Sequence, residues 1–82
     1  MPDPSPSETL RAAAARLGEC SPFVLIAGKR VAVEPLAAWL DRDSVTYDVD
    51  LCRLELGTIT DGYFRARFAA PLAFARSILE QP

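Results

Sequence analysis

The chain has 82 residues, half of them hydrophobic and 24% charged, and eleven acidic against nine basic residues give it a formal net charge of −2. This length and composition are typical of one globular domain and not of a disordered chain. The acidic balance disfavours non-specific binding to nucleic acid, and the absence of histidine excludes catalytic triads and zinc sites built on that residue.

The first predicted element is a helix with a well-marked start. Ser5 fits the N-cap, Pro6 fits the first helical position, and Glu8 stands where a capping box places its acidic residue. The helix is predicted over residues 6–17, with Gly18 as its C-terminal cap. Its apolar face consists of Leu10, Ala13, Ala14 and Leu17.

Two β-branched runs follow and predict a hairpin. Gly28 and Lys29 lie between them, and glycine at the first central position fits a type II′ turn. That turn would pair Ile26 with Val31. The hairpin then has an unusually apolar second face, which must be covered by a helix or by another chain. This face carries Leu25 and Ala32.

A short helix is predicted next, over residues 35–41, with Leu36, Trp39 and Leu40 as its apolar stripe. Trp39 is interpreted as a core residue, because so small a domain needs its largest apolar side chain inside. If Trp39 is partly exposed, it becomes the first candidate for an interface contact.

The apolar period then changes to two, which predicts a half-buried strand over residues 45–51. A second hairpin is predicted over residues 53–68, because Asp61 and Gly62 fit the two central positions of a type I′ turn. A bulge near Cys52 would keep the two strand segments in phase.

The last predicted helix covers residues 71–80 and begins at Pro71. The fold class is therefore α+β: an antiparallel sheet of about four strands, made of two hairpins and packed by two to three helices in the order α-β-β-α-β-β-α. Residues 1–82 are expected to form one small domain, with a flexible tail at residues 1–5.

No residue constellation predicts a reaction, so we expect neither catalysis nor a cofactor nor a metal. Four aspartates lie within ten residues, but they fail the calcium-loop template, and we interpret them as solvated or edge-protecting charge. Cys20 and Cys52 belong to no redox motif and are interpreted as buried, unpaired thiols. The four aspartates are Asp41, Asp43, Asp48 and Asp50.

The candidate binding residues are arginines and an aromatic on the outer face of the second hairpin: Arg53, Tyr63, Arg65 and Arg67. This composition is typical of an interface anchor or a phosphate-reading patch. Cross-strand pairing with nearby acidic residues explains the same arginines without any function. Leu25 and Trp39 complete the candidate set.

By elimination, the leading hypothesis is a small non-enzymatic protein-binding module: an adaptor, an inhibitor or a regulatory subunit, of a size and charge that fit a phage- or mobile-element-encoded inhibitor. The alternative is a nucleic-acid-associated regulator that uses the 53–68 hairpin. We further expect a homodimer through the Leu25 face and the surface of Ala13 and Ala14. A cytoplasmic location is expected, because the N-terminus lacks a secretory signal and no apolar run is long enough to cross a membrane.

Overall fold

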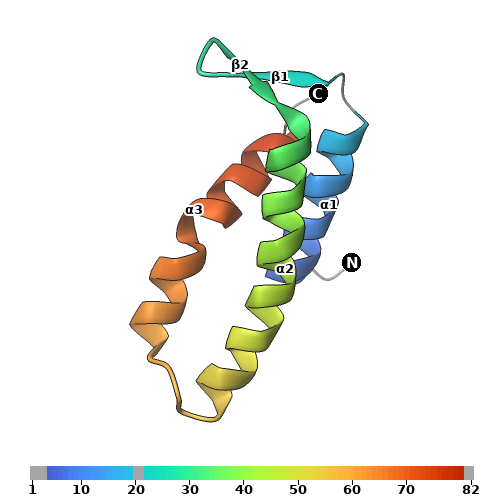
Figure 1. The fold of residues 1–82 in the computed structure, drawn as a ribbon. Helices are drawn as coiled ribbons and strands as arrows, with labels where there is room; N and C mark the ends of the chain where they lie inside the picture. The colour runs from blue at the N-terminus through green and yellow to red at the C-terminus, as the bar shows by residue number, and fades with distance from the viewer. Residues whose placement is uncertain (1–3, 20–21, 81–82) are drawn as a thin grey trace.

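The computed structural model describes residues 4–19 and 22–80. Three helices run side by side, and a β-hairpin between the first and the second lies across one end of them (Figure 1). The elements are α1 (Pro6–Gly18), β1 (Phe23–Ile26), β2 (Lys29–Ala32), α2 (Val33–Glu55) and α3 (Asp61–Glu80). The shorter α1 accompanies only the hairpin-proximal half of α2 (Figure 1). Part of the expected tail, residues 1–3, lies outside the described residues.

The expected four-stranded sheet is wrong. Within the described residues the only sheet is the two-stranded β1–β2 hairpin, and both segments predicted as further strands are helical. The 35–41 helix continues through the predicted strand at 45–51 to Glu55, and the 53–68 segment holds the end of α2 and the start of α3. The molecule is a helical hairpin packed by a third helix.

Helix α1 confirms the predicted start. The Ser5 hydroxyl accepts a hydrogen bond from the Glu8 backbone N–H at 3.3 Å, and the Glu8 carboxylate accepts one from the Ser5 N–H at 3.2 Å. The end differs, because Gly18 remains helical and Glu19, also right-handed, is the C-cap. The predicted apolar face is the buried one, with Leu10, Ala13, Ala14 and Leu17.

The first hairpin is present, but its turn lies one residue earlier than predicted. Ala27 and Gly28 occupy the turn with φ of 52° and 78°, so both central positions are left-handed, as in a type I′ turn. The register therefore pairs Ile26 with Lys29 and Leu25 with Arg30, in place of the predicted pairing of Ile26 with Val31. The two faces keep their predicted members, because the shift preserves the alternation of side chains.

Helix α2 is long because its inward positions follow one helical spacing from end to end. Residues spaced alternately four and three apart point to the interior, which is the pattern of a helix packed against neighbouring helices. Once such a helix has begun, each further residue adds a backbone hydrogen bond, so the polar stretch at 41–44 does not end it. The inward positions are Leu36, Leu40, Asp43, Tyr47, Asp50 and Leu54.

A Schellman motif ends α2 and gives the chain its sharp reversal. Gly57 has a φ of 79°, its N–H donates to the Leu54 carbonyl at 3.1 Å, and the Thr58 N–H donates to the Arg53 carbonyl at 2.9 Å. Thr60 then caps α3, because its hydroxyl accepts a hydrogen bond from the Tyr63 N–H at 3.1 Å. The reversal is therefore at Gly57, not at the predicted 61–62 turn.

This arrangement predicts opposite effects for two glycines that both have open space around them. Gly57→Ala places a side chain on a left-handed residue and is expected to lower the free energy of unfolding by about 1–2 kcal/mol. Gly62→Ala replaces a glycine inside the first turn of a helix and is expected to be neutral or to raise it by up to about 1 kcal/mol. Urea denaturation of both variants checks this, and equal losses would contradict the assigned reversal.

The core lies where all three helices meet, near the hairpin. Helix α3 begins ten residues before the predicted Pro71 and continues through it, so the Arg67 carbonyl has no N–H at position 71 to accept from. The helix bends along its length, and its C-terminal half packs on α1 and α2 (Figure 1). The buried apolar cluster is Leu10, Ala13, Ala14, Leu17, Val33, Leu40, Ala75 and Ile78.

Candidate protein-binding surfaces

The arginines expected on one sheet face are divided between two helices and three acidic partners. Arg67 of α3 donates from Nη2 to Oδ1 of Asp43 on α2 at 3.1 Å. Arg53 donates from Nη1 to Oδ1 of Asp50 at 3.1 Å, one helical turn away on α2. The expectation that the arginines meet acidic partners is correct, although the partners are helical neighbours and not cross-strand ones.

Arg65 lies apart from the other candidate residues. Its Nε donates to Oδ2 of Asp61 at 2.9 Å, an exposed pair within α3. Helical spacing places Tyr63 and Arg67 together on one side of α3, since they are four residues apart, and directs Arg65 to the opposite side. The predicted shared face of Arg53, Tyr63, Arg65 and Arg67 is therefore wrong for Arg65.

The Arg67–Asp43 pair is the most deeply placed charge pair in the described chain. Asp43 is only 2% exposed, and the hydrogen bond that Arg67 donates to it, opposed by burial, holds the pKa of Arg67 above its ordinary value. Oδ2 of Asp43 is buried and has no hydrogen-bond partner among the described residues. Asp43 lines none of the four main hollows formed by residues 4–19 and 22–80, and its pair with Arg67 links α2 to α3.

The four aspartates do not form one solvated edge as expected. Asp43 and Asp50 are buried, whereas Asp41 and Asp48 are exposed. Asp48 accepts a hydrogen bond from Nη2 of Arg11 on α1 at 2.8 Å, in an exposed pair that ties α1 to the middle of α2. No group of three or more potential metal ligands gathers within residues 4–19 and 22–80.

Trp39 lies at the edge of the core. Its indole is partly buried and stacks on Phe74 of α3, with ring centroids 5.6 Å apart and planes inclined by 20°. Farther along the α2–α3 interface, Tyr47 packs on Phe64 and Phe68 at centroid distances of 4.9 and 5.1 Å. Burial raises the pKa of Tyr47, and the Asp48 carboxylate adds to the effect. These aromatic contacts serve the association of α2 with α3.

The first hairpin exposes the apolar face expected of it. Leu25 is 67% exposed, and Phe23 and Ala32 on the same face are exposed as well. The surface of Ala13 and Ala14 is not available for the expected dimer, because the three-helix core buries both residues. The homodimer as expected, through the hairpin and α1 together, thus loses one of its two surfaces.

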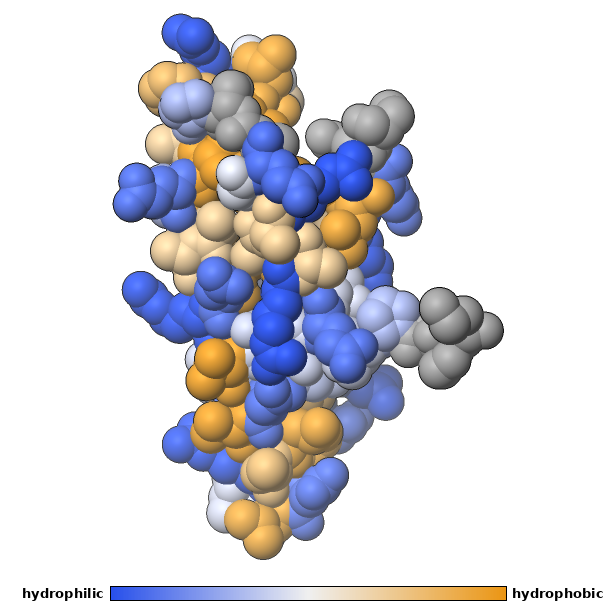
Figure 2. All heavy atoms as spheres, turned by 90° about the vertical axis from the view of Figure 1, so that its right-hand side faces the viewer, coloured by the Kyte–Doolittle hydropathy of each residue, from blue (hydrophilic) through white to orange (hydrophobic). Residues whose placement is uncertain are grey.

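A second exposed apolar surface was missed from the sequence. Val45, Val49, Cys52 and Leu56 follow each other at spacings of four, three and four residues, and all four are exposed. These positions lie opposite the inward positions of α2, so they form a row on its solvent side. We call this row the outer stripe. Apolar surface with charged side chains beside it is visible at the end of the molecule distant from the hairpin (Figure 2).

The outer stripe was not predicted, because Val45, Val49 and Leu56 were assigned to the inner face of strands. The four-three-four spacing was the signal that could have revealed it. Its thiol also corrects an expectation, since Cys52 is free and exposed instead of buried. Cys20 lies outside the described residues.

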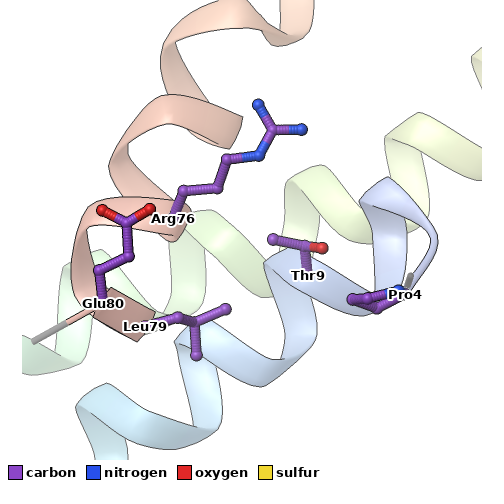
Figure 3. A pocket seen from close by; sticks show the side chains of 5 residues that line it. All are labelled: Pro4, Thr9, Arg76, Leu79 and Glu80. Atoms are coloured by element: carbon purple, nitrogen blue, oxygen red, sulfur yellow. The ribbon is translucent and has the colours of Figure 1, made fainter. Parts of the chain in front are cut away.

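Two hollows of the surface are candidate ligand sites, which need several polar groups directed at one point. The hollow in Figure 3, of about 360 Å³, lies between α1 and α3, with Arg76 and Glu80 at its rim. Thr9 in its wall is buried, and its hydroxyl donates to the Ser5 carbonyl at 3.1 Å. A more apolar hollow, of about 710 Å³, lies at the base of the hairpin. Among the described residues that line these two hollows, no buried side-chain nitrogen or oxygen lacks a hydrogen-bond partner.

None of the helices in the described ranges has the length and apolar character needed to cross a membrane. Comparisons with protein-family models, with curated protein sequences and with solved structures gave no match.

Proposed function

We propose that the protein is a non-enzymatic binding module that docks on another protein chain through the outer stripe of α2, as an adaptor, an inhibitor or a regulatory subunit does. The observation that carries the proposal is the exposure of this stripe: Val45 is 60% exposed, Val49 45% and Leu56 79%, all on one face of one helix. Single exposed apolar residues are ordinary, whereas a row of them at helical spacing is typical of a helix that docks on a partner.

The surroundings of the stripe support binding by a protein. Charged side chains line both of its long sides, with Asp48 and Glu55 on one side and Arg53 on the other. An apolar centre within a polar rim is the usual anatomy of a protein interface, in which the centre supplies affinity and the rim supplies orientation.

The charged groups also favour binding over catalysis. The buried Asp43 is paired with Arg67, and Cys52 lies on an open helix face. A nucleophile needs an adjacent base and a concave site, and none of these residues combines the two.

The nucleic-acid alternative depended on a hairpin over residues 53–68. The 53–68 segment forms helices instead of a hairpin, and the carboxylates of Asp50, Asp61 and Asp43 engage all three of its arginines. Phosphate binding would have to displace these ion pairs, which weakens the electrostatic term on which such binding depends. We therefore retain protein binding alone.

Alkylation of Cys52 tests the proposal, because this thiol lies within the stripe. The Cys20→Ser variant keeps Cys52 as its only cysteine. It is treated with a maleimide in three conditions: at low protein concentration, at high protein concentration, and in a lysate of the source cell. We expect alkylation of Cys52 to slow by roughly tenfold at high protein concentration or in the lysate, which corresponds to about nine-tenths of the chains being bound.

The matched control carries Cys20→Ser and Cys52→Ser together with Ala66→Cys, which places the thiol on an exposed position of α3. Its alkylation should proceed at the same rate in all three conditions. Equal rates for Cys52 in all three conditions would contradict docking through the outer stripe.

A further inference from the structure

We infer that the outer stripe binds a second copy of this chain, and that the two α2 helices lie parallel about a two-fold axis. This inference rests on the proposed function and adds the identity of the partner. The charges beside the stripe differ between its two long sides.

One side of the stripe is acidic and the other is basic. Asp48 and Glu55 directly precede Val49 and Leu56, whereas Arg53 directly follows Cys52. At 100° per residue, these positions place the two carboxylates on one flank and the guanidinium on the other. Asp41, seven residues before Asp48, extends the acidic flank by about two further turns.

Unlike flanks select the relative direction of two helices. When two helices pack in parallel about a shared apolar seam, each flank of one helix faces the opposite flank of the other, and a residue meets the one five positions later in the partner. Asp48 then faces Arg53 of the partner subunit, and the two-fold axis repeats the contact. In an antiparallel pair, Asp48 and Glu55 would face the partner's acidic flank, and their like charges would repel.

The side chains that would meet are free to do so. Asp48 uses Oδ2 for its bond to Arg11, which leaves Oδ1 available, and its side chain is half exposed. Arg53 uses Nη1 for Asp50, and its side chain is 59% exposed. Since a guanidinium has five N–H donors, Arg53 can keep Asp50 and bind the partner's Asp48 as well.

The stripe also lies where the chain has room for another helix. Most of it lies in the half of α2 that α1 does not accompany (Figure 1), although Arg11 of α1 reaches Asp48 on the acidic flank. Arg42, one turn before Val45, ends the apolar row, so the seam is confined to residues 45–56. A seam of under two heptads predicts a reversible dimer at micromolar concentrations.

Disulfide trapping reads the direction directly. In a Cys20→Ser background, the single thiol is Cys52 itself or, with Cys52→Ser added, Val45→Cys or the control Ala66→Cys, and each protein is oxidised gently. A parallel dimer brings both Cys52 and Val45→Cys against their own counterparts, so both should be trapped as dimers. In an antiparallel pair centred on position 52, the copies of position 45 would be about 21 Å apart, given a rise of 1.5 Å per residue.

A mixing experiment tests the charge argument without new cysteines. Asp48→Lys and Arg53→Glu each turn both contacts of the homodimer into like-charge contacts, so each protein alone should sediment as a monomer. In the mixture every contact pairs unlike charges, and a mixed dimer should form. Circular dichroism of each variant establishes that it is folded.

Two results would overturn the inference: trapping at position 52 without trapping at 45, or a wild-type chain that stays monomeric at every micromolar concentration. If Cys52 is protected in the lysate although the purified protein does not associate with itself, the proposed function stands and the partner of the stripe is a different protein. Cys52 unprotected under all conditions would refute both.

Discussion

The Phe68→Ala variant is expected to lose about 3–5 kcal/mol of unfolding free energy, the usual loss for a buried phenylalanine. Phe68 is 1% exposed, and its ring lies 5.1 Å from that of Tyr47 and 5.4 Å from that of Phe64. Truncation leaves a cavity among these rings at the interface between α2 and α3. A domain this small has a free energy of unfolding of about 5–10 kcal/mol, so the variant should be close to unfolding.

Urea denaturation followed by circular dichroism measures this loss. The control is Leu25→Ala on the exposed hairpin face, which should stay within about 0.5 kcal/mol of the parent protein. If the two variants lost the same free energy, the aromatic cluster would not be the link between α2 and α3.

Arg67→Met is expected to lower the free energy of unfolding by about 3 kcal/mol, because it leaves the buried carboxylate of Asp43 without its counter-charge. The one oxygen of Asp43 that has a partner would lose it, and the other oxygen already has none. Arg67 is 37% exposed, so some water reaches the pair and keeps the loss below the largest values seen for buried pairs.

The double variant Asp43→Leu, Arg67→Met separates this effect from a loss of packing. With both charges replaced by apolar side chains, the free energy of unfolding should return to within about 1 kcal/mol of the parent or exceed it. Thermal and urea unfolding of the two variants check the prediction. A double variant no more stable than Arg67→Met alone would show that packing, and not charge, determines the loss.

The parts of the fold predicted correctly are those that local chemistry determines. The start of α1 follows from a cap, a proline and a capping-box glutamate within four residues, and all three occupy the predicted positions. The two faces of the first hairpin also follow from alternation alone. The turn was misplaced, because alanine with a positive φ at position 27 is not expected from its side chain.

The second half was mispredicted because α2 has two apolar faces. Tyr47 points inward, while Val45 and Val49 belong to the outer stripe, so the three together imitate the alternation of a strand. A single helix face would have shown the period of 3.6 residues clearly. Nothing local to residues 45–51 separates the two interpretations, and the continuous inward spacing over 36–54 was the signal that decides between them.

The positions of the candidate binding residues were also predicted only in part. Arg53 and Arg67 were singled out for their type, and the structure places them in ion pairs with the two buried aspartates. The burial of these aspartates depends on how α2 and α3 pack, and the strand prediction did not include that packing. Leu25 was placed on the apolar second face of the hairpin from the alternation of side chains alone, and in the structure this residue is 67% exposed.

The unequal lengths of the helices imply that local stability varies along the molecule. At 1.5 Å per residue, the 13 residues of α1 extend about 20 Å and the 23 residues of α2 about 35 Å, so the last two turns of α2, beyond the Arg11–Asp48 pair, have one helical neighbour instead of two. Segments with few buried contacts open most often, and their amide hydrogens exchange with solvent first. A chain seated on the outer stripe would slow that opening at the end of the molecule where the backbone reverses, so that association and local order reinforce each other.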